Sequence, residues 1–228
     1  MRVGVTLPTF RADAAVLDAA RAAESAGLDG VFVFDHLWPI GAPHRPALSA
    51  FPVLGAVAAV TRRVWVGPLV ARVGMVPDAL LAAQLLSVAR MAPGRFVAAL
   101  GTGDSKSAPE NVAFGLPYPA AAQRRAALAT VARQVAAQGV PVWVGGGSAA
   151  TEALAVALGA AVNLWQARPE QVAAAASRGE VTWGGALPAD RAGATEQLAA
   201  LAAAGASWAV CVWPASLAAL AEARDALG

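Results

Sequence analysis

The stretch that decides the fold is Arg95-Phe-Val-Ala-Ala-Leu-Gly-Thr-Gly-Asp104, in a chain of 228 residues. Residues 96–100 are all apolar, which is typical of a strand covered on both faces. Gly101 and Gly103 end the run, and because they lack a Cβ, backbone or ligand can approach them closely. We therefore expect Asp104 at the carboxyl end of a central strand, where α/β folds carry their chemistry. Taken alone, such a turn more often only connects a strand to the next element of the chain.

The same alternation of a short apolar strand and a helix runs through the whole chain. We expect strands at residues 3–7, 30–34, 64–70, 96–100, 140–144, 161–165, 181–183 and 208–213. We expect helices at residues 13–26, 51–60, 77–90, 120–137, 148–158, 169–176, 192–204 and 215–227, and a loop at 104–119. Eight strands alternating with eight helices imply a parallel sheet with right-handed crossovers. The pattern predicts an α/β protein, a compact (β/α)8 TIM barrel with short loops, with residues 1–228 as one domain.

A doubly wound open sheet is the alternative arrangement of these elements. Its dinucleotide fingerprint, Gly-x-Gly-x-x-Gly, is expected after the first strand. That strand ends instead in Leu7-Pro8-Thr9. The sequence therefore favours the barrel.

The composition excludes several other classes of protein. Apolar residues make up 57% and mean hydropathy is +0.54, but Gly, Pro or charged residues interrupt every apolar run well before the length of about 20 residues that spans a membrane. The net charge is +2 without a basic cluster, which gives nucleic-acid binding little support. Cys211 is the sole cysteine and lies in an apolar run, so we expect it in the core. Without a disulfide or a visible secretory signal, the expected location is cytoplasmic.

In a barrel the carboxyl ends of the strands form one mouth, where the candidate functional residues collect. They are Asp35 and His36 after the second strand, Val70, Ala71 and Arg72 after the third, Gly101, Thr102, Gly103 and Asp104 after the fourth, and Gly145, Gly146 and Gly147 after the fifth. The last group opens a helix capped by Ser148, whose free N–H groups are a natural seat for an anion.

These residue types allow more than one interpretation. His36 suits proton transfer because an unperturbed imidazole has a pKa of about 6.5, but a lone histidine is usually structural or solvated. Asp35 either takes part or orients a loop through backbone N–H groups. Trp38 is either a wall for a flat ring or an exposed loop side chain. Arg72 pairs either with a ligand's phosphate or carboxylate or with another surface side chain.

Two kinds of site are not expected. Asp35, His36 and Asp104 carry metal-binding atoms, but the sequence shows no second histidine at ligand spacing. No Gly-x-Ser-x-Gly elbow is present for acyl transfer.

The chain resembles the luciferase-like monooxygenase superfamily, the flavin- and deazaflavin-dependent (β/α)8 barrels. The resemblance rests on Phe34-Asp35-His36-Leu37, on Pro93-Gly94-Arg95-Phe96 leading into Gly101-Thr102-Gly103, and on Pro141-Val142-Trp143-Val144-Gly145-Gly146. It implies a cofactor across the barrel mouth, with its ring against a bulge at Val70-Ala71-Arg72 and its tail near the glycines. Within the superfamily these motifs look most like the coenzyme F-420 enzymes. By that resemblance His36 is the base, and Asp104 is the acid that manages the deazaflavin's proton.

The sequence departs from the family pattern in ways that bear on function. The acid after Gly-x-Gly is usually glutamate, so Asp104 is one methylene shorter, and Trp38 stands two rather than four residues after the histidine. The chain is also shorter than most members, which insert segments over the substrate pocket. It has no clear match to the basic residues of the sugar-phosphate dehydrogenases, which disfavours a sugar-phosphate substrate.

We therefore expect an F-420-dependent oxidoreductase that transfers a hydride between the deazaflavin and a small organic substrate. One alternative is an FMN-dependent monooxygenase that uses reduced flavin and O2. Another is a barrel that binds a flavin-type ligand without turnover. The expected partners are a small-molecule substrate, a flavin or F-420 reductase and a second copy of the chain in a homodimer, with neither nucleic acid nor membrane.

Overall fold

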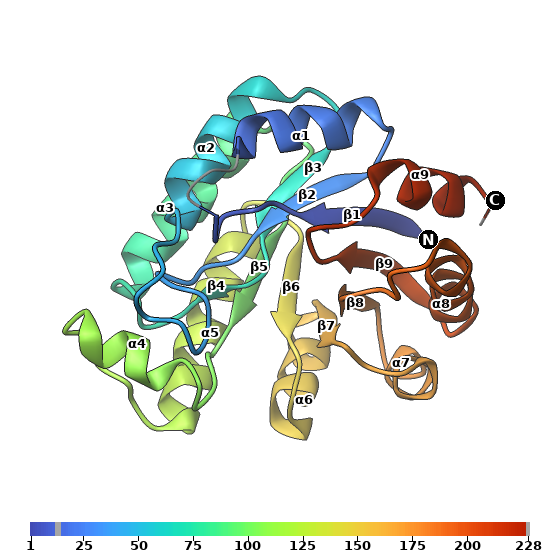
Figure 1. Cartoon of the computed structure of the whole chain (residues 1–228). Helices are drawn as coiled ribbons and strands as arrows, with labels where there is room; N and C mark the ends of the chain where they lie inside the picture. The colour runs from blue at the N-terminus through green and yellow to red at the C-terminus, as the bar shows by residue number, and fades with distance from the viewer. Residues whose placement is uncertain (12–14, 227–228) are drawn as a thin grey trace.

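In a computed structural model of the chain, residues 1–11 and 15–226 are described, and their strands and helices alternate (Figure 1). The strands are β1 (Arg2–Thr6), β2 (Gly30–Val33), β3 (Trp65–Pro68), β4 (Ala71–Arg72), β5 (Ala98–Gly101), β6 (Val142–Gly145), β7 (Ala161–Trp165), β8 (Val181–Gly185) and β9 (Ala206–Cys211). The helices are α1 (Val16–Ser25), α2 (Ala50–Val60), α3 (Asp78–Met91), α4 (Ala108–Ala113), α5 (Ala121–Ala136), α6 (Ala149–Leu158), α7 (Pro169–Ala176), α8 (Arg191–Ala203) and α9 (Leu217–Asp225).

All of these strands pair in parallel in one sheet, in the order β3-β2-β1-β9-β8-β7-β6-β5-β4. The sheet closes on itself through a parallel bridge between Val66 of β3 and Phe96, just before β5. The Val66 N–H donates to the Arg95 carbonyl (2.8 Å), and the Val97 N–H donates to the Val66 carbonyl (3.0 Å). Because β3 and β4 are two halves of the third barrel strand, the prediction of a (β/α)8 barrel is confirmed.

The inside of the barrel is packed with large aromatic rings. Phe32, Trp143 and Trp208 lie against one another with ring centroids 5.3–5.8 Å apart. Glycines on β1 and β2 make room for them, since a Cβ on Gly30 would lie 2.9 Å from atoms of both Phe32 and Trp208. The barrel is thus a filled core, as in other folds of this type, and ligands are confined to its ends.

The structure differs from the sequence prediction in two places. The expected third strand at residues 64–70 is interrupted at the Leu69–Val70 peptide bond, which is cis, before β4 begins. The expected loop at residues 104–119 contains the six-residue helix α4. Other elements agree within about two residues at their ends, and the ends expected at Asp13 and Leu227 lie outside the described residues. In the described part of the chain, each helix is too short or too polar to cross a membrane.

Candidate functional site at the barrel mouth

Asp35 and Arg72 join the second and third barrel strands at the mouth. The Asp35 carboxylate accepts the Arg72 backbone N–H at 2.9 Å, and the Arg72 Nε donates to the Asp35 carbonyl at 2.8 Å. Burial raises the pKa of the Asp35 carboxyl above its ordinary value, although the Arg72 N–H and the charges of Arg72 and His36 act in the opposite direction. Asp35 therefore orients backbone at the mouth, which is one of the two roles predicted for it.

Glu110, on α4, reaches back over these residues and is buried, with 1% of its side chain exposed. One carboxylate oxygen, Oε2, lies 2.9 Å from His36 Nδ1. The other, Oε1, accepts the Leu37 backbone N–H and lies 3.0 Å from Arg72 Nη2. Arg72 is itself buried, and its Nη1 lies 3.4 Å from the side-chain oxygen of Asn111. The guanidinium is thus engaged by protein groups rather than open to a ligand.

The charge state of this cluster follows from its contacts. Burial by itself raises the pKa of the Glu110 carboxyl, but the hydrogen bonds from His36 and Leu37 and the charge of Arg72 outweigh it and lower the pKa below its ordinary value. Glu110 is therefore ionised at neutral pH. In the described part of the chain, the His36 ring hydrogen-bonds through Nδ1, and its Nε2 has no protein partner.

Val70 forms the floor of the mouth beside this cluster. A Cβ on Gly101 would lie 2.3 Å from Val70 Cγ2, and one on Gly145 would lie 3.6 Å from the same atom. The sequence predicted a close approach of either protein or ligand at Gly101, and in the structure the Val70 side chain approaches it. The glycine lets the bulge between β3 and β4 fold inward, with Ala71 buried behind it.

Asp104 lies in the turn after β5, where its side chain is exposed. Its Oδ1 accepts the backbone N–H groups of Lys106 (2.9 Å) and Ser107 (3.2 Å). Gly103 adopts φ +65°, and the Thr102 carbonyl accepts a hydrogen bond from Arg124 Nε (2.8 Å). These contacts give Asp104 a structural role in shaping the turn that leads to α4. The role of Asp104 as an acid stays a prediction.

The glycine turn after β6 has one open side. Gly146 packs against β7, where a Cβ would lie 2.9 Å from the side chains of Leu164 and Val162. Gly147 has φ +146°, and a Cβ placed on it would have no atom of the described residues within 4 Å. Ser148 then caps α6 by accepting the Thr151 N–H at 3.2 Å. The turn therefore keeps the exposed helix N-terminus that the sequence predicted as an anion seat.

Aromatic side chains line the rest of the mouth. Phe10 stacks on Phe34 at 5.5 Å, and Trp165, from the end of β7, meets Phe34 edge-on at 5.8 Å. Trp38 packs against Phe114 beyond α4 at 5.4 Å. The rim around His36 is consequently apolar, and Trp38 contacts another loop side chain rather than standing alone.

The sequence did not point to Glu110 or Asn111 as part of the site. They occur in a segment that lacks helical periodicity, and α4 spans six residues, so the available signal was only a carboxylate and an amide shortly after the Gly-x-Gly turn. Cys211 is buried as expected, and burial raises the pKa of its thiol to about 12, which excludes a reactive thiolate. Among the described residues, no three His, Cys, Asp or Glu side chains are grouped to hold a metal ion.

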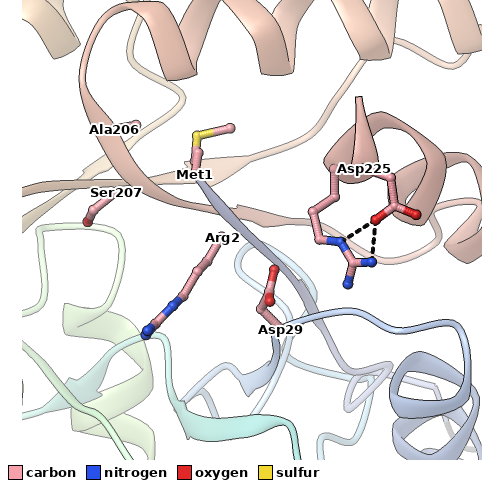
Figure 2. A pocket seen from close by; sticks show the side chains of 7 residues that line it. Met1, Arg2, Asp29, Ala206, Ser207 and Asp225 are labelled. Atoms are coloured by element: carbon pink, nitrogen blue, oxygen red, sulfur yellow. Dashed lines mark hydrogen bonds and ion pairs between the residues drawn. The ribbon is translucent and has the colours of Figure 1, made fainter. Parts of the chain in front are cut away.

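A second cleft opens at the opposite, amino-terminal end of the barrel (Figure 2). It is lined by residues from the start of β1, the start of β9 and the end of α9. Its polar groups are engaged: Asp29 accepts the Val3 N–H (2.8 Å), Arg224 pairs with Asp225, and the Arg2 guanidinium lies over the Trp65 and Trp208 rings, 5.4 Å from each centroid. We assign the candidate site to the mouth, because His36 there keeps one ring nitrogen without a partner among the described residues and because barrels of this type carry their chemistry at the carboxyl ends of the strands.

Comparison with known proteins identifies the family. A family model described as luciferase-like monooxygenase matches residues 1–134, more than half of the chain, and the chain belongs to that family. The F-420-dependent glucose-6-phosphate dehydrogenase of Nakamurella multipartita is 39% identical over 115 residues, which cover 49% of this chain. The match covers only 32% of that relative's length.

Solved structures agree with the fold along the whole chain. An F-420-dependent secondary alcohol dehydrogenase, in complex with an F-420–acetone adduct, superposes with a TM-score of 0.77 at 16% identity, covering 100% of this chain and 99% of the other. The coenzyme F-420-dependent tetrahydromethanopterin reductase from Methanopyrus kandleri gives 0.74 at 12% identity, with coverage of 97% and 96%. At these sequence identities, the similarity supports the fold alone.

Proposed function

We propose that this chain is a coenzyme F-420-dependent oxidoreductase that transfers a hydride between the deazaflavin and a small organic substrate. The family membership and the F-420-dependent relatives support the cofactor class. The observation that carries the proposal is His36, which is partly exposed at the barrel mouth. Its Nδ1 is held by Glu110, and its Nε2 is unpaired as far as residues 1–11 and 15–226 are concerned. A ring nitrogen presented this way suits proton exchange with an alcohol or carbonyl substrate.

The residues at the mouth fit a flat cofactor with an anionic tail. Val70 offers an apolar surface between Gly101 and Gly145, and the open turn at Gly147 leads to the N-terminus of α6. The buried hydroxyl of Thr9, which follows β1, has no hydrogen-bond partner among the residues that the structure describes. We assign cofactor contact to Val70, Thr102, Gly103, Gly145 and Gly147. Asp35, Ala71, Arg72, Gly101 and Gly146, which pack against other parts of the protein, shape the floor on which the cofactor lies.

The chemistry divides between the cofactor and the protein. When bound, F-420 supplies the hydride acceptor or donor. In the oxidation of an alcohol, His36 Nε2 accepts the proton of the substrate hydroxyl while the carbon that bears this hydroxyl loses the hydride. The aromatic rim around His36 favours an uncharged, apolar substrate. A protein reductase, a homodimer and a cytoplasmic location remain predictions.

A direct titration of the purified chain with F-420 and with FMN, followed by cofactor fluorescence, tests the proposal. We expect F-420 to bind with a dissociation constant near or below about 1 μM, roughly −8 kcal/mol, and FMN to bind more weakly. The reverse preference supports the monooxygenase alternative instead. Binding of neither cofactor overturns the assignment.

Substitution at His36 and Asp104 separates turnover from binding. We expect His36→Ala to keep F-420 binding but to lose about 10²–10⁴-fold in kcat, the usual contribution of general acid–base catalysis. Asp104→Asn keeps an oxygen that accepts the Lys106 and Ser107 N–H groups but cannot supply a proton. A similar loss in Asp104→Asn supports an acid, whereas unchanged activity leaves Asp104 with its turn-shaping role only.

A further inference from the structure

Glu110 receives three contacts that divide its two carboxylate oxygens between different partners. Oε1 takes the Leu37 N–H and the Arg72 guanidinium, and Oε2 takes His36 alone. An ionised carboxylate is only an acceptor, so the proton in the hydrogen bond between His36 and Glu110 belongs to the imidazole. The hydrogen bond made by one ring nitrogen decides which nitrogen of a neutral histidine carries its proton.

We propose that Glu110 is a positioning residue, which holds neutral His36 in the form protonated at Nδ1 and so leaves Nε2 as a proton acceptor for substrate. The inference rests on the proposed function for its catalytic consequence, but the tautomer is a property of the chain alone. The proposal also gives helix α4 a role in the site, because this helix carries Glu110. Through Glu110, this short helix reaches the loop between β2 and α2, which Figure 1 shows close to it.

The surroundings of Glu110 make the consequence of a substitution specific. In Glu110→Gln, the side-chain amide has one oxygen and one NH2 group. The oxygen belongs where Oε1 was, because the Leu37 N–H and the Arg72 guanidinium are both donors. The NH2 group then faces His36 Nδ1 and donates to it. We therefore expect the isosteric glutamine to invert the tautomer, so that Nε2 carries the proton and no longer serves as a base.

The experiment is ¹⁵N NMR of the histidine rings in the full chain without cofactor, in alkaline buffer where imidazole is neutral. The chain has two histidines, and exposed His44 is an internal reference. We expect wild-type His36 to show a protonated Nδ1 and an unprotonated Nε2, and Glu110→Gln to show the reverse. The His44 signals stay unchanged.

Asn111→Ala is the matched control on the same helix. It removes the contact with Arg72 and the hydrogen bond to the Pro117 carbonyl (3.0 Å) but keeps the carboxylate of Glu110. We expect His36 to stay protonated at Nδ1 in this variant. If Asn111→Ala inverts the tautomer as Glu110→Gln does, the effect comes from loosening α4 and the inference is overturned. A wild-type His36 protonated at Nε2 also overturns it, whether or not any variant folds.

Kinetics with F-420 and an alcohol give a second readout. We expect Glu110→Gln to lower kcat by about 10²–10⁴-fold, as for loss of a general base, while the F-420 dissociation constant changes by less than about 3-fold. Loss of F-420 binding in Glu110→Gln with normal kcat at saturation contradicts a positioning role. If the wild type binds no F-420, the proposed function fails, and the NMR spectra alone decide the tautomer.

Discussion

At the scale of the residue, Gly101 is packed tightly against the Val70 side chain. A Cβ at this position would lie 2.3 Å from Val70 Cγ2, closer than two carbon atoms can approach. We expect Gly101→Ala to lower the free energy of unfolding by about 1–3 kcal/mol, the usual cost of overpacking, because the bulge must move. Urea denaturation of the purified variant measures this change.

Val70→Ala supplies the control for this clash. It removes the atom that the new Cβ would meet, so the double variant should recover much of the stability that Gly101→Ala loses. Simple additivity of the two single changes would show that the glycine is needed for some other reason. The same double variant should bind F-420 more weakly, because the floor of the mouth becomes flatter.

Glu110 also makes stability depend on pH. Its pKa in the folded chain is lower than the ordinary value of 4.5, so the unfolded chain binds more protons in the interval between the two. The stabilisation is complete above about pH 4.5 and is lost as the pH falls through the lower, folded pKa. We expect Glu110→Gln to be less stable than the wild type by about 1–3 kcal/mol at pH 7. The difference should shrink in urea titrations below pH 4.5, and a constant difference at all pH values would contradict this account.

At the scale of the element, Arg95 ties helix α2 to the seam where the barrel closes. Its guanidinium donates to the carbonyls of Ala58 (2.7 Å), Thr61 (2.9 Å) and Val64 (3.1 Å), at and beyond the C-terminus of α2. Its own carbonyl accepts the Val66 N–H across the seam. A forked cation at a helix C-terminus satisfies the last carbonyls, which lysine does only in part.

We expect Arg95→Ala to cost about 2–4 kcal/mol in the free energy of unfolding and Arg95→Lys about half as much, because several carbonyls lose a charged donor. Arg133→Ala, an exposed arginine in the last turn of α5, is the control and should stay within about 0.5 kcal/mol of the wild type. Chemical denaturation compares the three variants. Equal effects at Arg95 and Arg133 would exclude a special role for the seam.

The sequence predicted this level of structure well where periodicity or an apolar run was strong. Strand 161–165 and helix 169–176 coincide with β7 and α7. The third strand was harder to predict, because the interruption between Leu69 and Val70 is set by packing of Val70 across the barrel against Gly101 and Gly145. Helix α4 was missed because it is held by buried polar contacts of Glu110 and Asn111 rather than by an apolar face.

The same limit applies to the site. His36 and Asp35 could be placed at the mouth because each follows a strand directly. The partnership of His36 with Glu110 joins residues 74 positions apart, and no local pattern encodes it. Arg72 was predicted at the mouth, but its burial under α4 could be seen only once Glu110 and Asn111 were in place.

At the scale of the whole molecule, the two ends of the barrel offer two places for a ligand. Hydrogen exchange can show which of the two ends binds it. The mouth has the least regular backbone, with the two-residue β4 and the loops on either side of α4. Amides in such segments exchange by local opening. Because a ligand at 100 times its dissociation constant stabilises the state it binds by about 2.7 kcal/mol, exchange by openings that break the site slows by up to about 100-fold.

We expect F-420 to slow exchange of amides in residues 35–40, 102–117 and 145–149, all of which belong to the mouth. Amides at the start of β9 and at the end of α9, which line the amino-terminal cleft, should exchange at unchanged rates. Mass spectrometry of the labelled chain with and without F-420 makes this comparison in a single experiment. Slowing confined to Asp29, Ser207 and α9 would instead move the ligand to the amino-terminal cleft, where His36 and Glu110 could take no part in its chemistry.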